Sequence, residues 1–147
     1  MNPIRFFVEG EPIAQPRPRG RIVRLKGGKV RAGMYDAGTA KSWKNRIILQ
    51  SKRHRPHAPI NGPLRVDLLF FMPRPKNHFG TGKKARVLKQ TADIWHTKKP
   101  DKDNLEKAVL DALTNAQFFN DDSQVCAGET NKRYHASPGC LITISQP

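Results

Sequence analysis

The sequence predicts an α/β fold of the α+β kind, with a small mixed sheet, two main helices packed on it and a basic hairpin near the N-terminus. Three observations predict it. Short apolar runs with strand character occur near both ends and in the middle of the chain, two segments have the apolar spacing of amphipathic helices, and two basic runs flank a Gly-Gly turn. With 147 residues, of which 37% are hydrophobic, the whole chain, 1–147, is expected to form a single domain.

The N-terminal part is expected to contain one strand and one hairpin. Ile4–Glu9, IRFFVE, reads as the strand, and the glycine that follows ends it. In the next segment, PIAQPRPRG, three prolines impose extended backbone, so its arginines project from a stiff loop. RIVRL and KVRAGMY, joined at 26–29, resemble a hairpin that could reach into a nucleic-acid groove. The other interpretation is an ordinary sheet edge that charge protects from aggregation.

The first helix is expected over Thr39–Arg53. Trp43, Ile47 and Ile48 fall there at helical spacing with basic residues between them, so one face points to the core and the other is cationic. Pro56 ends any continuation of this helix.

The strongest strand pattern lies over Pro63–Pro73, PLRVDLLFFMP. Its alternation puts Val66, Leu68 and Phe70 on one face, while Leu64 is assigned to a more mixed face. A run this apolar is expected at the centre of the sheet.

The C-terminal part is expected to contain a long loop, a helix and two strands. Arg74 to Pro100 is basic and poor in regular pattern, and a loop of that length in a compact domain is usually functional or disordered. SQVCAGETNKRY is read as one strand and CLITIS as the last. Between them and the loop, from Asp101, a helix is expected to bury the stripe Leu105, Ala108, Val109, Ala112 and Leu113.

The charge of the chain is strongly basic and unevenly distributed. Lys and Arg number 27 against 12 Asp and Glu, giving a formal net charge of +15 and a sequence pI near 10.4. This balance favours a polyanionic partner such as nucleic acid over an acidic protein surface. Residues 1–100 carry 23 basic and 5 acidic residues, whereas residues 101–147 carry 4 and 7. The acids are therefore concentrated where the bases are few.

Cysteine content and hydropathy predict a cytoplasmic protein with no membrane partner. The chain has only Cys126 and Cys140, and it lacks an apolar run long enough for a signal peptide or a spanning helix. A zinc site built from these cysteines and His135 is disfavoured, because the spacing lacks the paired C-x-x-C form.

Two pairs of aspartates stand out in the acidic C-terminal section. Asp101 and Asp103 lie two residues apart, and in extended backbone residues i and i+2 share a face, so the two carboxylates would converge. The alternative is that Asp103 is a helix N-cap or first-turn residue. That alternative explains neither Asp101 nor the second pair, Asp121 and Asp122.

A divalent cation would neutralise these carboxylates. Mg²⁺ prefers oxygen ligands, keeps several waters, and typically uses one or two carboxylates plus a substrate phosphate. Two such ions could clamp the attacking and leaving oxygens in phosphodiester hydrolysis, while the basic surroundings hold the flanking phosphates. The residues therefore favour a metal-dependent nuclease. D-x-D pairs also serve glycosyltransferases, but that interpretation leaves the basic charge unexplained.

A lysine lies on the same side of the predicted helix as two of its aspartates. Asp103, Lys107 and Asp111 are one helical turn apart, opposite the apolar stripe. Lys107 could hydrogen-bond a scissile phosphate or stabilise its developing charge. Its alternative role is an i,i+4 ion pair with one of the two aspartates.

The acidic motifs resemble a known family. KPDKDNLEKAVLDAL followed by FFNDDSQV is similar to the signature of RusA-type Holliday junction resolvases, in which a D-x-D-N helix start, a lysine four residues on and a D-D-x-Q-V segment form the site. PIAQPRPRG and MYDAGTAKSW, near the front, resemble the phage-borne branch of that family. The resemblance thus spans most of the chain and implies a RusA-like fold.

The resemblance also implies roles for individual residues. Asp101, Asp103 and Asp122 match the acidic metal ligands, Lys107 matches the essential lysine, and Asn104 is an accompanying motif position. The implied cofactor is Mg²⁺, with Mn²⁺ as a substitute.

Two positions qualify the resemblance. Asp121 matches the first acid of the D-D pair, for which a direct role does not follow. Lys102 stands between the first two aspartates where an apolar residue is common in the family. The lysine therefore either removes a buried packing interaction or adds an interaction with phosphate.

The implied activity is paired cleavage of a four-way DNA junction in recombination and repair, inside a bacterial or phage-infected cell. The implied assembly is a homodimer in which each active site cuts one strand. The alternative from another class is a non-catalytic branched-DNA-binding protein, for which the basic front section would suffice. In either case the expected DNA contacts are Arg17, Arg19, Arg21, Lys98 and Lys99.

Overall fold

The computed structural model describes residues 1–35 and 38–147, without the side chains of Arg19 and Tyr35. Part of the MYDAGTAKSW segment therefore lies outside the described residues. The helices are α1 (Lys41–Ser51), α2 (Lys102–Asn115) and the short 3-10 turns η1 (Lys52–His54), η2 (Lys76–His78), η3 (Gly82–Lys84) and η4 (Asp122–Gln124). The strands are β1 (Ile4–Glu9), β2 (Arg19–Arg24), β3 (Val30–Tyr35), β4 (Leu64–Met72), β5 (Val125–Ala127), β6 (Thr130–Tyr134) and β7 (Gly139–Ser145).

The predicted mixed sheet and its central strand are confirmed. The strands are ordered β1-β7-β4-β5, and β6 also pairs with β4. Strand β7 runs antiparallel to both β1 and β4, whereas β5 and β6 run parallel to β4. Alternate residues of β4 are buried from its first position, so Leu64 lies on the apolar face with Val66 and not on the mixed face.

The expected single strand over SQVCAGETNKRY is two strands, β5 and β6. The strand is interrupted at Gly128, whose φ is 146°. A Cβ at this position would lie 1.9 Å from the carbonyl oxygen of Val66. Only glycine fits such a close approach between two backbones, so the break is a packing requirement of the sheet.

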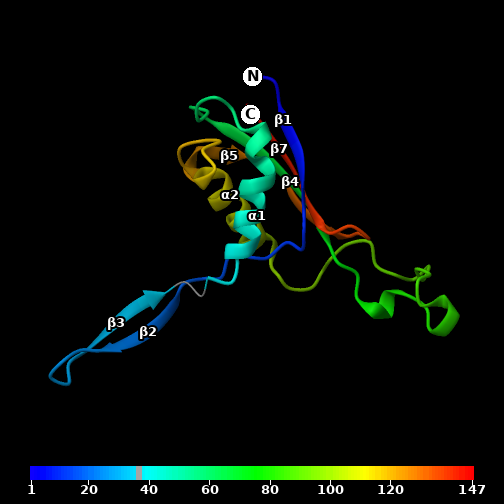
Figure 1. Ribbon diagram of the computed structural model, residues 1–147, viewed down its shortest axis with the longest axis horizontal. Coiled ribbons are helices and arrows are strands. Elements are labelled where there is room, and N and C mark those ends of the chain that lie inside the picture. The colour runs from blue at the N-terminus through cyan, green and yellow to red at the C-terminus, as the bar shows by residue number, and fades with distance from the viewer. Residues whose placement is uncertain (36–37) are drawn as a thin grey trace.

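Helices α1 and α2 lie together on one side of the sheet (Figure 1). The predicted apolar stripe of α2 is fully buried, and α1 buries Trp43 and Ile47 against the same core. This core fixes the outer side of α2, and with it the polar residues of that side, relative to the sheet.

Two segments project from the end of the body at which α2 begins (Figure 1). One is the predicted hairpin of β2 and β3, whose turn contains Gly27 and Gly28 at φ 84° and 79°. The other is residues 74–99, which we call the basic lobe. The lobe contains η2, η3 and an isolated bridge between Phe79 and Leu88, so it is a structured segment.

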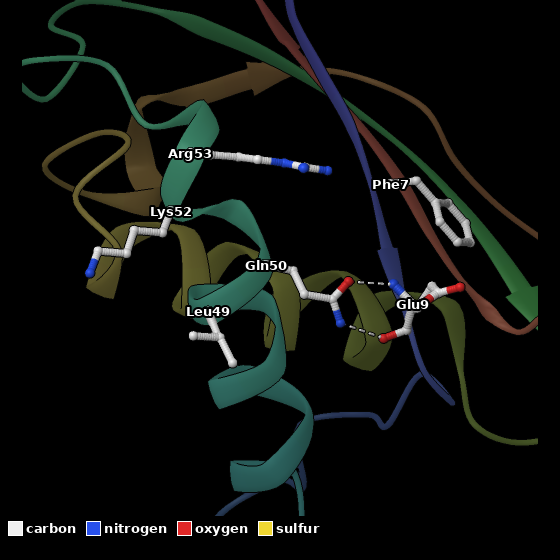
Figure 2. Close-up of a pocket in the computed structure, with 6 residues that line it drawn as sticks. All are labelled: Phe7, Glu9, Leu49, Gln50, Lys52 and Arg53. Carbon is white, nitrogen blue, oxygen red and sulfur yellow. Dashed lines mark hydrogen bonds between the residues drawn. The ribbon is translucent and has the colours of Figure 1, made fainter.

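The free edge of β1 is partly covered by a side chain of α1. Gln50 accepts a hydrogen bond from the Glu9 backbone N–H at 2.8 Å and donates one to the Glu9 carbonyl at 3.0 Å (Figure 2). Unpaired edge groups invite pairing with other chains, so this amide protects the edge. Within the described residues, no helix is long and apolar enough to cross a membrane.

Candidate active site

The first two aspartates lie at the start of α2. Asp101 is the N-cap residue, with extended backbone, and its side chain makes no capping hydrogen bond. Asp103 lies inside the first helical turn. The expectation that Asp101 and Asp103 share one face of an extended backbone is therefore wrong, whereas the alternative that Asp103 is a first-turn residue is confirmed. Both carboxylates remain exposed at the positive end of the helix dipole, which favours negative charge there.

Residues 14–18, which lead into β2 and which we call the hairpin stem, contact this first turn. The backbone N–H of Gln15 donates to the carbonyl of Asn104 at 2.9 Å, and the Arg17 guanidinium lies 3.6 Å from the Asp103 carboxylate. Both charged side chains are more than two-thirds exposed, so their pairing is weak and easily exchanged. Arg17 is thereby placed beside the Asp103 carboxylate.

Lys107 links the helix to the second acidic pair. Its Nζ lies 2.6 Å from Asp122 and 3.0 Å from Asp111. Hydrogen bonds to Asp122 and Asp111 raise the pKa of Lys107, so this side chain is a cation at neutral pH. On the far side of Asp111, Lys44 from α1 lies at 3.7 Å. Four alternating charges therefore run from α1 across α2 to η4.

A compact turn holds Asp121 and Asp122 in place. The Asp121 carboxylate accepts the Ser123 N–H at 2.8 Å, and bonds to Ser123 lower the pKa of Asp121. Gln124 completes the turn: its Oε1 accepts the Asp121 N–H at 3.1 Å and its Nε2 donates to the carbonyl of Ile60 at 2.9 Å. Asp121 is therefore the cap of η4, which leaves Asp122 to face Lys107.

A lysine on β6 holds the segment before Asp101. The Lys132 ammonium donates to the carbonyls of Lys98 at 2.6 Å and Pro100 at 2.7 Å. Burial lowers the pKa of Lys132, and the nearby Asp101 carboxylate opposes this effect. Lys132 therefore fixes the backbone from which Asp101 starts the helix.

A second contact ties β6 to α2. The Thr130 hydroxyl donates to the Glu106 carboxylate at 2.8 Å, five residues after the cap. Side chains of β6, those of Thr130 and Lys132, therefore hold the start of α2 in place through hydrogen bonds.

Two hollows flank the acidic residues. One, of about 430 Å³, lies between the hairpin stem and α2, with Arg17, Lys99 and Asp101 in its lining. The other, of about 290 Å³, has Lys107 and Asp122 in its lining, beside Lys44. Both carry basic and acidic groups together, which suits a phosphate held near carboxylates.

A larger hollow, of about 580 Å³, lies between β1 and the end of α1 (Figure 2). Its lining includes the acidic residue Glu9 and the basic residues Lys52 and Arg53. It is lined by none of the predicted site residues, so its size alone does not make it a catalytic site.

The donor chemistry of the helix start and of η4 fits a hard divalent cation, since Asp101, Asp103 and Asp122 all offer carboxylate oxygens. Their placement does not form a closed site. In residues 1–35 and 38–147, no three His, Cys, Asp or Glu side chains are grouped so that they alone could hold a metal ion. A Mg²⁺ ion that takes one or two carboxylates and completes its shell with water and phosphate needs no such group.

The remaining predicted DNA contacts lie on both projecting segments. Arg21 is exposed on β2, and Lys98 and Lys99 are exposed immediately before the helix cap. Arg19 is also in β2, but its side chain lies outside the described residues. The hairpin and the basic lobe thus each carry predicted contacts.

The alternative role of Lys107, an i,i+4 ion pair with an aspartate of α2, is confirmed with Asp111 at 3.0 Å. Sequence reasoning missed the roles of two other residues that shape this site, Gln124 and Lys132. Gln124 stands in the D-D-x-Q-V segment, but its role as a clamp on the turn requires the backbone around Ile60 to be known. Lys132 had no signal, because only the sheet brings it to the segment before Asp101.

Comparisons with known proteins agree with these motifs. The family model described as Endodeoxyribonuclease RusA matches residues 9–145. The chain is 38% identical over 146 residues to the uncharacterized protein YqaN of Bacillus subtilis (strain 168), covering 99% of this chain and 98% of that protein. It is 26% identical over 127 residues to a crossover junction endodeoxyribonuclease rusA of Lactococcus phage r1t, covering 86% of each chain.

Proposed function

This chain belongs to the RusA endodeoxyribonuclease family, and from that premise we propose that it is a Mg²⁺-dependent endonuclease that cuts four-way DNA junctions. The observation that carries the proposal is the contact of Lys107 with Asp122 at 2.6 Å. It joins the helix that starts with D-x-D-N to the D-D-x-Q-V turn, two motifs that are separate in the sequence.

The proposed ligands of the metal are Asp101, Asp103 and Asp122. When bound, Mg²⁺ would supply an activated water and neutralise charge on the scissile phosphate. The cations that now lie beside two of these carboxylates, Arg17 and Lys107, would then be released to phosphate oxygens. Exposed ion pairs are worth at most about 1 kcal/mol each, so this exchange has a low cost.

Lys107 is proposed to stabilise the charge that develops on the phosphate. The ordinary lysine pKa of about 10.4 already keeps it protonated at neutral pH, so it donates hydrogen bonds and is not the general base. Asp111 holds it at 3.0 Å from the side away from Asp122. The lysine therefore stays in place when Asp122 changes partner.

The hairpin is proposed to contact the DNA backbone. Arg21 and Arg31 lie on one of its faces according to the strand register, and Ile22, Val30 and Met34 are exposed on the other. A basic face suits the phosphates next to the scissile one. A homodimer would then place two such sites on one junction, giving paired incisions and nicked duplex products, as DNA recombination and repair require. Mn²⁺ is expected to replace Mg²⁺.

Asp103→Asn tests the proposal, because it keeps the shape of the side chain and removes its charge. The expected result is junction binding at or above the wild-type level with cleavage lost. Removing the charge relieves repulsion with DNA and weakens the metal site. Binding is measured by mobility shift in Ca²⁺ or EDTA and cleavage by a labelled strand in Mg²⁺. A variant that cuts at the wild-type rate would remove Asp103 from the site.

A non-catalytic branched-DNA-binding protein is the alternative. It is favoured by the finding that Asp103 and Asp122 already have cationic neighbours in the protein alone. This alternative predicts that the wild-type protein binds junctions and leaves them intact at every concentration of Mg²⁺ or Mn²⁺.

A further inference from the structure

The basic lobe, residues 74–99, projects from the body on the side of the α2 start that lies away from the hairpin (Figure 1). We propose that the lobe is a second DNA-contacting arm, which lies along the backbone of a DNA duplex while the hairpin contacts the DNA on the other side of the site. This inference rests on the proposed DNA substrate. It adds a binding surface that the cleavage chemistry does not require.

The charge of the lobe is strongly one-sided. Its only acidic residue is Asp93, and every residue from 81 to 91 is exposed. A surface of this kind attracts a polyanion and releases counterions when it binds one. The eight basic residues are Arg74, Lys76, Lys83, Lys84, Arg86, Lys89, Lys98 and Lys99.

The outer part of the lobe has its own backbone structure. The Gly80 N–H donates to the carbonyl of Val87 at 3.0 Å, and the Lys89 N–H donates to that of His78 at 2.9 Å. These bonds flank the bridge of Phe79 and close a loop that carries the central lysines. The charges are therefore presented on an ordered surface, which lowers the entropy cost of binding.

The base of the lobe is attached to the edge of the sheet. The Tyr134 N–H donates to the carbonyl of Ile94 at 2.9 Å and the His96 N–H donates to that of Lys132 at 3.2 Å. Tyr134 is buried between the rings of His78 and His96, with centroids 4.7 and 4.9 Å away. The lobe is thus held at a fixed position relative to β6.

The same strand fixes the active-site end of the lobe. Lys132 binds the carbonyls on both sides of Lys99, and Asp101 follows immediately. A DNA backbone that runs from the acidic residues towards the basic lobe would contact Lys98 and Lys99 first and the lysines of the outer loop beyond them. Order, charge and continuity with the site all point to the backbone of the substrate.

Exposed apolar side chains on the lobe leave one competing partner. Val87, Leu88, Ile94 and Trp95 are each about half exposed, as at a protein interface. Protein interfaces are depleted in lysine, however, whereas the outer loop of the lobe carries three lysines and an arginine among exposed residues. DNA is therefore the partner that this surface favours, and a protein partner is an outcome that the test can return.

The first test is a charge substitution with a matched control. In the lobe variant, Lys83, Lys84, Arg86 and Lys89 are changed to Gln. The control variant changes Arg5, Lys52, Arg53 and Arg55 to Gln, which belong to β1 and the segment after α1, at the end of the body near both termini (Figure 1). Both variants lose the same net charge, so only the location of the charge differs.

The affinity of each protein for a four-way junction is measured at several salt concentrations in EDTA. The slope of log K against log salt should fall by about 0.9 for each phosphate that the protein no longer neutralises. The lobe variant is expected to neutralise at least two fewer phosphates and to bind at least tenfold more weakly at low salt. The control is expected to keep the wild-type slope. Equal slopes in the two variants would overturn the proposal.

Tryptophan fluorescence gives a second measurement on the intact protein. The chain has two tryptophans: Trp43 is 2% exposed and Trp95 is 57% exposed, so acrylamide quenching reports mainly Trp95. Junction DNA is expected to shield Trp95 from acrylamide, and the effect should vanish in Trp95→Phe. Unchanged quenching with DNA bound would place the lobe off the DNA and leave a protein partner for its apolar side chains.

Failure of this inference and failure of the proposed activity give different results. If the wild-type protein never cuts DNA but the lobe variant loses salt slope, the lobe is a DNA-binding arm on a non-catalytic protein. If the wild-type protein cuts junctions and the lobe variant keeps its slope, the catalytic proposal stands and the lobe proposal is wrong.

Discussion

Replacing Lys107 with Met removes the cation that lies between Asp122 and Asp111 while keeping the length and apolar stem of the side chain. This variant has two effects. Loss of two ion pairs lowers the free energy of unfolding, and loss of a charged donor at the scissile phosphate lowers the cleavage rate. Their expected sizes differ enough to separate a structural role from a catalytic one.

The structural effect is small because the Lys107 side chain is 53% exposed. The pairs at 2.6 and 3.0 Å are screened by water, and exposed pairs contribute about 0.3–1 kcal/mol each. We expect the variant to lose about 1 kcal/mol of unfolding free energy, and Lys44 still neutralises Asp111. The catalytic effect should be larger: losing one donor to developing charge typically costs about 10²–10³ in rate, or about 2.7–4 kcal/mol.

The assay compares single-turnover cleavage of a labelled junction with unfolding in urea for the wild type, Lys107→Met and the control Lys52→Met. Lys52 is exposed on η1, away from the start of α2, and its replacement makes the same charge change. The control should cut at the wild-type rate. A Lys107→Met protein that is folded and cuts within about threefold of the wild type would refute the catalytic role.

The pH dependence of stability tests the ion pairs of Lys107 with Asp122 and Asp111. The pKa of Lys107 is raised in the folded protein, so the ion pairs contribute fully below the ordinary lysine pKa of about 10.4 and are lost as pH rises through the higher folded value. The stability that these ion pairs contribute should therefore stay constant between about pH 7 and 10, as measured by urea unfolding of the wild type and Lys107→Met.

Further predictions concern Lys132 and His96. Lys132→Met should release the carbonyls of Lys98 and Pro100 and so misplace Asp101, which should lower the cleavage rate by about tenfold and leave junction binding intact. Lys132→Arg should restore part of the rate. Equal cleavage rates in the wild type and both variants would show that Lys132 does not support the site. Burial and the nearby Lys132 lower the pKa of His96. His96 therefore binds more protons when the basic lobe is detached from β6 than when it is packed against β6. Packing of the lobe on β6 should weaken as pH falls below about 6.5. Hydrogen exchange of residues 74–99, corrected for intrinsic rates, should rise between pH 7.5 and 5.5, and His96→Phe should abolish that pH dependence; an unchanged exchange pattern in the wild type would contradict it.

Sequence patterns predicted the elements whose burial is decided locally. The apolar stripe of α2 and the alternation of β4 are each fixed by one buried face, so periodicity was sufficient to find them. The break at Gly128 was not predicted, because it depends on the carbonyl of Val66, 62 residues earlier in the chain. The order of the basic lobe was likewise undecided, because it comes from the edge of β6.

The candidate site was predictable in its composition and less so in its geometry. The aspartates were identified from their pairing in the sequence and from the family resemblance. Asp103 lies in the first turn, which was one of its two expected positions, and Asp101 is the N-cap because the helix begins at Lys102. The helical spacing predicted Asp103 or Asp111 as the ion-pair partner of Lys107. The contact with Asp122 could not be predicted, because it depends on the turn that Gln124 holds.

The central claim is that the start of α2 and the turn at Asp122 form a metal-dependent DNA-cutting site. The most direct measurement incubates the wild-type protein with a four-way junction labelled on each strand in turn, and with a matched duplex, across a Mg²⁺ titration. We predict paired incisions in opposing strands of the junction, none without a divalent metal, and an intact duplex. A junction that is bound but never cut in Mg²⁺ or Mn²⁺ would contradict the claim.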